Sequence, residues 1–234
     1  MNSTAVVALK VTGLTISVIA IFGNGLVGFI ITRVQSMKTS MNYIILNLAI
    51  LDALTGFFTI YYQLTNDYNE VLGPSLLKQA YNQSAHFAEV LCKIETLTYL
   101  GTSISPLLLT AMAYERYKAI VHPLSRLNNE VTRSRLKWIL SISWVWGFGY
   151  AIFDMCIIQY YAEENYCDDK ELGTWYSYGV YELVYTSIQF ILTSITMFIL
   201  YLKVILALRR QDGALATQAN AQQARAKARR KMNM

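Results

Sequence analysis

The chain has 234 residues, of which 54% are hydrophobic and only 15% are charged, with a formal net charge of +5. Soluble domains usually carry about a quarter charged residues. The composition therefore excludes an ordinary soluble domain and favours a membrane protein.

Long apolar segments follow one another along the chain. Residues 11–32 carry no charge, and four later stretches are almost as free of it. About 20 apolar residues in a helix cross a hydrocarbon core of roughly 30 Å. Only helices or closed barrels satisfy the backbone in lipid, and these runs are too long for barrel strands. The sequence predicts an all-α membrane protein with a transmembrane domain at 1–210 and five spanning helices at about 9–34, 41–65, 90–120, 136–159 and 177–206.

Basic and acidic residues alternate between the connecting segments. Lysine and arginine gather after the first, third and fifth predicted helices, whereas the intervening segments are acidic. The positive-inside rule makes the basic segments cytoplasmic and leaves the amino terminus outside. Two acceptor triplets for glycosylation, at Asn2 and Asn82, fall in the segments predicted to be outside. We expect a multi-pass protein of the plasma membrane, in contact with the lipid bilayer.

Three polar residues lie at similar depth in the predicted bundle. Asp52 is near the middle of the second helix, where an ionisable group costs on the order of 3 kcal/mol. It should face the interior, near Asn24 of the first helix and Ser105 of the third. Their oxygens suit a hard monovalent cation such as sodium. A hydrogen-bonded structural carboxyl without an ion is an equal alternative, and no other cofactor is expected.

The chain has three cysteines. Cys92 lies at the outer start of the third predicted helix, and Cys167 lies in the loop before the fifth. Outer segments mature in an oxidising compartment, where cysteine pairs persist. We therefore predict a Cys92–Cys167 disulfide that pins this loop across the top of the third helix. Cys156, within the fourth helix, is expected to be a small buried apolar residue.

An acid and a base stand together at the inner end of the third predicted helix. Glu115 and Arg116 follow a run without charge that begins after Glu95. Unpaired charges are costly at the membrane edge, so the two side chains are expected to satisfy each other. Such a pair is either a switch or an interfacial anchor.

Several motifs occur in a fixed order on the predicted helices. The motifs are "GNGLV" around Asn24, "LNLAILDAL" around Asp52, Cys92, "ERY" at 115–117, "HPL" at 122–124, Trp144 and Tyr201. This ordered set resembles the rhodopsin-like (class A) family of G-protein-coupled receptors, up to about Arg210. The family usually carries prolines in spans four and five. These two spans contain no proline here, so the chain departs from the family pattern.

The resemblance implies roles on the inner face. In the family, the arginine matching Arg116 is held by its acidic neighbour at rest. On activation it is released to contact the G protein and the tyrosine matching Tyr201. Tyr117 completes the triplet, and Pro123 and Leu124 match positions that present an apolar knob to the G protein. The expected partner is therefore a heterotrimeric G protein.

The outer side supplies the candidate ligand-binding residues. Thr98 or Tyr99 falls where amine receptors keep an aspartate, and neither side chain can pair with an ammonium group. The loop before the fifth helix is acidic and aromatic, which suits cationic or aromatic groups. A peptide with basic residues is the expected ligand, and a solvated loop without ligand contact is the alternative. The remaining candidates are Glu95, Glu163, Glu164, Asp168 and Asp169.

Residues 211–234 form a basic segment, expected to be cytoplasmic and to lead towards a sixth helix that the sequence does not contain. In the resembled family the sixth helix swings outward on activation, so the chain alone is expected not to signal. A truncated isoform that associates with full-length receptors is one alternative, and a transporter or channel fragment is another. No nucleic-acid partner is expected. Enzymatic activity is not expected either, because neither His86 nor His122 lies near a cysteine or carboxylate pair with ligand spacing.

Overall fold

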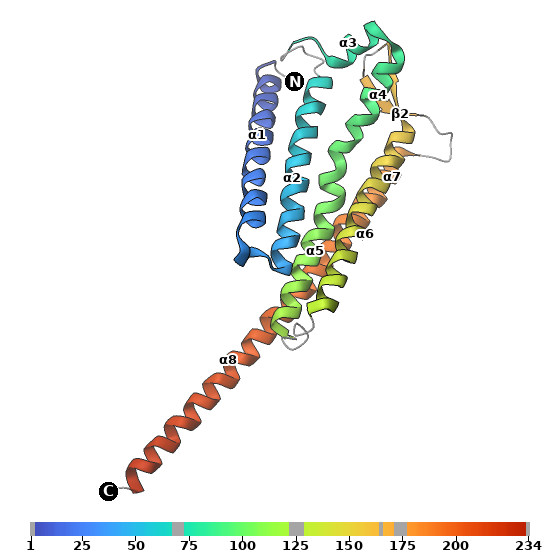
Figure 1. Ribbon diagram of the computed structural model, residues 1–234. Helices are drawn as coiled ribbons and strands as arrows, with labels where there is room; N and C mark the ends of the chain where they lie inside the picture. The colour runs from blue at the N-terminus through green and yellow to red at the C-terminus, as the bar shows by residue number, and fades with distance from the viewer. Residues whose placement is uncertain (1–2, 67–72, 122–128, 164–165, 171–176, 233–234) are drawn as a thin grey trace.

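The computed structural model describes residues 3–66, 73–121, 129–163, 166–170 and 177–232. Its long helices run side by side as a bundle, and the last of them extends well beyond the others (Figure 1). The first two long helices are α1 (Ser3–Arg33) and α2 (Ser40–Thr65), joined by the short 3₁₀ helix η1 (Gln35–Met37). They pack closely against each other along the bundle. At Gly56 of α2, an added Cβ would lie 2.9 Å from the backbone oxygen of Ser17, so this approach requires glycine.

The third predicted span is built from several consecutive pieces. Above the bundle lies α3 (Leu76–Gln83), followed by α4 (Ala85–Glu95), the 3₁₀ turn η2 (Thr96–Tyr99) and α5 (Leu100–Val121). The helix α5 occupies the centre, because it packs against α2, α6 and α8. Its side chains of Leu100, Ile104 and Leu108 are almost fully buried and form the middle of the core.

The fourth long helix is α6 (Asn129–Ile157), which leads into a hairpin of β1 (Ile158–Tyr161) and β2 (Tyr166–Asp169). The strands pair antiparallel, with Tyr160 opposite Cys167. Within the bundle, the indole nitrogen of Trp144 donates a hydrogen bond to the side-chain oxygen of Asn47 at 2.9 Å. This bond ties α6 to α2.

The fifth predicted span consists of α7 (Tyr178–Thr186), a π-helical turn η4 (Ser187–Leu192) and α8 (Thr193–Met232). The π-helical turn lies in the fifth predicted span, which contains no proline. Its buried Gln189 donates a hydrogen bond to the backbone oxygen of Ser103 in α5. A π-helical turn of this kind changes the phase of the side chains that follow it.

The outer surface of the bundle is strongly apolar. Large side chains such as Phe22 and Val145 are 75% and 72% exposed, as expected for a surface that meets lipid rather than water. In the described part of the chain, four helical segments are long and apolar enough to cross a membrane: Thr4–Arg33, Ser40–Thr65, Ser134–Ile157 and Gly179–Gly213. The α5 helix is more polar, and its central place explains how its polar residues avoid lipid. The fold is that of an all-α membrane protein, as predicted, with one small hairpin that was not predicted.

Candidate functional site

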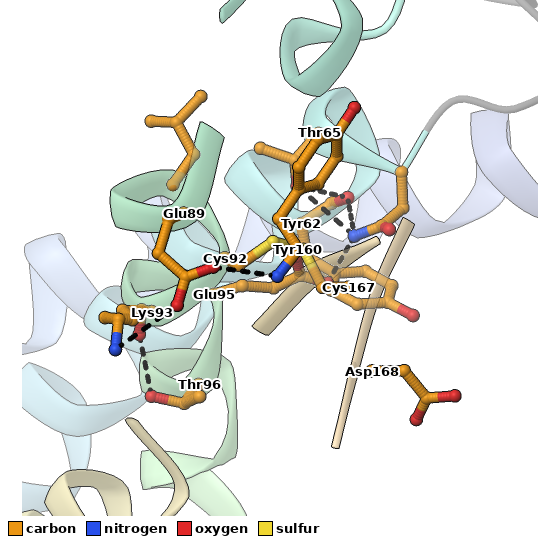
Figure 2. Close-up of a disulfide and its surroundings, with 12 residues drawn as sticks. Tyr62, Thr65, Glu89, Cys92, Lys93, Glu95, Thr96, Tyr160, Cys167 and Asp168 are labelled. Atoms are coloured by element: carbon orange, nitrogen blue, oxygen red, sulfur yellow. Dashed lines mark hydrogen bonds and ion pairs between the residues drawn. A yellow bond between two sulfur atoms is a disulfide. The ribbon is translucent and has the colours of Figure 1, made fainter. Parts of the chain in front are cut away.

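The predicted disulfide is present at the outer end of the bundle. Cys92 of α4 and Cys167 of β2 are bonded, with their Cα atoms 5.6 Å apart (Figure 2). A second tie joins the same elements, because the backbone nitrogen of Tyr160 donates to Glu89 at 2.9 Å. Glu89 also pairs with Lys93 at 3.5 Å. The hairpin is thus anchored to α4 by a covalent bond and by a charged hydrogen-bond acceptor.

A cavity of about 150 Å³ lies beside this bridge and is strongly acidic. Glu95 comes from the end of α4, Asp154 from α6, and Asp168 and Asp169 from β2. Glu95 and Asp154 are buried, whereas Asp168 is exposed at the rim. The complete lining is Tyr62, Asn66, Glu95, Thr96, Tyr99, Asp154, Ile158, Cys167, Asp168 and Asp169.

The two buried carboxylates differ in their hydrogen-bond donors, because Asp154 has two tyrosine hydroxyls, of Tyr150 and Tyr181, and Glu95 has one amide. Glu95 accepts a hydrogen bond from the amide of Asn66 through Oε1, while its Oε2 has no partner among the described residues. Asp154 accepts from the hydroxyl of Tyr181 at 3.4 Å. Burial raises the pKa of the Asp169 carboxyl, and the neighbouring charges of Asp168 and Glu182 raise it further. The unpaired Oε2 of Glu95 and the closeness of several carboxyl groups indicate that a cation in the cavity would stabilise their charged forms.

Sequence reasoning identified three of the four acidic residues of this lining and missed the fourth, Asp154. Of the predicted residues, Glu95, Tyr99, Asp168 and Asp169 line the cavity. Thr98 instead donates to the backbone oxygen of Phe58 in α2 at 3.2 Å. Asp154 was not among the predicted site residues, although an acid within a spanning helix is itself a signal of function. Glu163 is exposed in the hairpin turn, and Glu164 lies outside the described residues.

A second cavity, of about 410 Å³, is open to the surface between α2, α5 and the η4–α8 segment. Asp52 and Ser105 both line it, together with Thr55, Thr193 and further residues. Thr55 Oγ1 is buried without a hydrogen-bond partner among the described residues. Carboxylate and hydroxyl oxygens are the donors that a hard cation prefers. The oxygen atoms of Asp52, Ser105, Thr55 and Thr193 therefore suit a hard cation such as sodium.

Asn24 does not join this cavity lining. Its side-chain amide donates to the backbone oxygen of Ala20 in the same helix, at 3.0 Å. The predicted grouping of Asn24 with Asp52 and Ser105 is thus reproduced for the two later residues only.

The ion pair at the inner end of α5 differs from the prediction. Glu115 is fully buried and accepts a hydrogen bond from Arg135 of α6 at 2.9 Å, whereas the neighbouring Arg116 is exposed. The expectation that Glu115 and Arg116 satisfy each other is wrong in this structure. Consecutive residues of a helix point in different directions and do not face each other. Glu115 faces α6, and Arg116 is left at the surface.

The other inner candidates lie around the same end. The ammonium group of Lys203 in α8 lies 5.8 Å from the ring centroid of Tyr117. Tyr201, also in α8, is 40% exposed. Pro123 and Leu124 lie outside the described residues.

Two further predictions concern single residues. Cys156 is exposed rather than buried, because it lies near the outer end of α6 on a face that no other described helix covers. Asn82 is exposed near the end of α3, which suits a glycosylation acceptor, whereas Asn2 lies outside the described residues.

Comparison with known proteins gives consistent similarities. Residues 23–234 match the family model described as 7 transmembrane receptor (rhodopsin family). The chain is 28% identical to the pyroglutamylated RF-amide peptide receptor of Rattus norvegicus over 86% of the chain and 45% of that receptor. It is 29% identical to a QRFP-like peptide receptor of Branchiostoma floridae, over 79% of the chain and 47% of the relative. It is 34% identical to neuromedin-U receptor 2 of Mus musculus, over 55% of the chain and 30% of the relative. The chain thus spans less than half the length of these curated relatives.

Proposed function

Because the chain belongs to the rhodopsin family of seven-transmembrane receptors, we propose that it acts within a receptor that binds an extracellular peptide and activates a heterotrimeric G protein. The observation that carries the ligand proposal is the acidic outer cavity beneath a disulfide-anchored hairpin. Relatives named as receptors for RF-amide peptides and neuromedin-U support a peptide ligand. We also infer that the receptor resides in the plasma membrane with this hairpin outside the cell, which the distribution of basic residues supports.

The path from ligand to G protein runs along one segment. Glu95 and Tyr99 line the outer cavity, and the α5 helix that begins at Leu100 reaches the inner end at Glu115 and Arg116. A ligand that displaces the outer end of this segment would also shift its inner end, because α5 is a continuous helix packed against three other helices. Arg116 is exposed there and is therefore accessible to a cytoplasmic partner.

The test uses cells that express the longest reading frame containing this sequence. G-protein dissociation is followed by resonance energy transfer while a panel of RF-amide, neuromedin and other basic peptides is added. We expect a saturable response to at least one peptide, and Arg116→Ala should lower it by about tenfold or more at equal surface expression. If no peptide produces a response from receptor verified at the surface, the peptide assignment fails. If Arg116→Ala leaves the response unchanged, the coupling role of Arg116 fails.

We further propose that Asp52 and Ser105 hold a sodium ion in the second cavity, between α2, α5 and the η4–α8 segment. The ion would supply the positive charge that a carboxylate at this depth otherwise lacks. The test is the melting temperature of the purified protein in sodium chloride and in an equal concentration of N-methylglucamine chloride. Sodium should raise the melting temperature of the wild type and have no effect on Asp52→Asn. An equal effect of sodium on both proteins favours the structural-carboxyl interpretation.

A further inference from the structure

The carboxylate of Glu95 has an incomplete set of partners. Only 6% of the residue is exposed, and it is held in place by Asn66 through Oε1. Its Oε2 has no hydrogen-bond partner among the described residues. Leaving a buried polar oxygen unpaired costs about 1–3 kcal/mol, and more for a charged group. Because Glu95 lines the outer cavity, the missing donor would come from the occupant of that cavity.

A second buried acid faces the same space from another helix. Asp154 of α6 is 8% exposed and lines the cavity together with Glu95. The described residues of the lining include no lysine, arginine or histidine. Three lysines lie near this end of the bundle: Lys93 donates to the backbone oxygen of Met155, Lys170 donates to that of Cys156, and Lys10 of α1 donates to that of Asn66 at 3.3 Å. The protein thus gathers buried negative charge at this point and, among its described residues, lines the cavity with no balancing cation.

The size and shape of the cavity limit what can balance that charge. At about 150 Å³ it is smaller than the roughly 300–1,000 Å³ of pockets that enclose a whole drug-sized ligand, so it fits a single side chain. Within the described residues, no group of three or more acidic, histidine or cysteine residues is arranged to hold a metal ion. The rings of Tyr62 and Tyr99 also line the cavity, and aromatic faces attract a planar cation.

We propose that Glu95 and Asp154 together bind the guanidinium group of an arginine side chain carried by the peptide ligand. A guanidinium presents five donors in a rigid plane and can satisfy two carboxylates at once while stacking on an aromatic ring. The ammonium group of lysine is a compact, strongly hydrated point charge and lacks this planar face. The proposal rests on the proposed function, because it takes the arginine to belong to the recognised peptide. It adds that Glu95 and Asp154 select arginine over lysine.

The experiment measures binding directly, without signalling. The probes are arginyl-phenylalanine amide and its analogues with lysine or citrulline in place of arginine, and the protein is the purified full-length chain in lipid nanodiscs. Citrulline keeps the shape of arginine and removes its charge. Saturation-transfer NMR titrations should give a dissociation constant for the arginine probe that is at least about tenfold lower than for either analogue. Equal affinity for the citrulline probe would overturn the proposal.

Two variants assign the effect to the named residues. Glu95→Gln retains an oxygen for Asn66, and Asp154→Asn retains an oxygen for Tyr181. Each should weaken the arginine probe by about tenfold or more, since a charge-assisted hydrogen bond is lost. Glu95→Gln should also melt no lower than the wild type, because the unpaired buried charge has been removed. The matched control is Asp212→Asn, an exposed carboxylate on α8, which should leave binding unchanged.

The outcomes separate this proposal from the proposed function. If the arginine probe binds as expected but no peptide activates a G protein, the proposed function fails and the arginine site stands. If a peptide without arginine activates fully, or if Glu95→Gln and Asp154→Asn both keep the affinity of the wild type, the arginine site fails and the receptor assignment stands. Should Glu95→Gln not fold, the comparison of probes on the wild type and on Asp154→Asn still decides.

Discussion

The ion pair of Glu115 with Arg135 is a buried charge that the structure satisfies only in part. Glu115 Oε2 and Arg135 Nε have no hydrogen-bond partners among the described residues, although the guanidinium also lies 5.6 Å from the ring centroid of Tyr114. Desolvation makes such a pair a weak source of net stability. Removing one partner is a different matter, because the remaining charge stays buried and unpaired.

The residue that neutralises Glu115 can be identified by substitution. Arg135→Ala should lower the free energy of unfolding by about 3 kcal/mol, the lower end of the range for breaking a buried pair, because the Arg135 side chain is 28% exposed. Arg116→Ala removes an exposed charge and should change stability by no more than about 0.5 kcal/mol. Denaturation of the purified protein in detergent micelles measures both values.

A double variant provides the control. Adding Glu115→Gln to Arg135→Ala removes the orphaned charge and should recover part of the lost stability. Equal losses for Arg116→Ala and Arg135→Ala would show that Glu115 does not prefer Arg135.

The sequence indicated which residues are important more reliably than it indicated which residues they contact. The Cys92–Cys167 bridge was predictable, because topology left only two cysteines in an oxidising compartment. The partner of Glu115 was not, since Arg135 is 20 positions away and only the packing of α5 against α6 brings it near. Asp154 could have been noticed as an acid within a spanning helix, but its neighbours in the cavity come from other elements and were not predictable.

At the scale of elements, one covalent bond joins the hairpin to α4, beside the hydrogen bond from Tyr160 to Glu89. Cys92→Ser and Cys167→Ser should each lower stability by about 2–5 kcal/mol, the usual effect of removing a native disulfide. The double variant should be no worse than either single one, since both remove the same bond. Cys156→Ser is the control and should have little effect, because that thiol is free and exposed. Melting curves under non-reducing conditions test these expectations, and additive losses would contradict them.

Packing between α5 and α6 depends on one glycine. A Cβ added at Gly147 would lie 2.2 Å from Cγ1 of Ile104, which is fully buried and has no room to move. Gly147→Ala should therefore destabilise by about 1–3 kcal/mol. Gly149→Ala lies on the same helix with nothing within 4 Å of the new atom, and it should be neutral or slightly stabilising. A comparison of unfolding midpoints separates the two, and equal effects would argue against this helix contact.

The spanning helices were predictable, because the length of an apolar run is enough to indicate them. Elements that depend on contacts with neighbouring helices were not predictable. Uncharged runs indicated the spanning helices, because lipid leaves the backbone few choices. The same runs carry no signal for the 3₁₀ turn η2, the β1–β2 hairpin or the π-helical turn η4. The fifth span lacks the proline usual in the family, but this absence did not predict a π-helical turn, and the bond from Gln189 to Ser103 depends on the neighbouring helix.

The whole molecule is polarised along its long axis. The hairpin lies at one end of the bundle, and the carboxyl-terminal end of α5 lies at the other (Figure 1). Hairpin residues line the acidic cavity, and the basic residues Arg116 and Lys203 lie towards the opposite end. Apolar side chains cover the surface between the two ends. By the positive-inside rule we expect the basic end to face the cytoplasm, so the acidic cavity would open to the exterior. A soluble extracellular peptide reaches the cavity only in this orientation.

Glycosylation tests the orientation of the whole bundle. Asn82 lies on α3, at the end that carries the hairpin, since the ring of neighbouring Tyr81 is 5.4 Å from that of Tyr160 in β1. In an Asn2→Gln background, protein from mammalian cells should carry a glycan that peptide N-glycosidase removes and that Asn82→Gln abolishes.

Lys38→Asn is the matched test at the opposite end. It creates an acceptor triplet with Thr39 and Ser40, at the start of α2, and this triplet should stay unmodified because the transferase acts in the lumen. If Lys38→Asn gained a glycan while Asn82 carried none, the bundle would be inverted. The acidic cavity would then face the cytoplasm, and the peptide and arginine proposals would both fail with it.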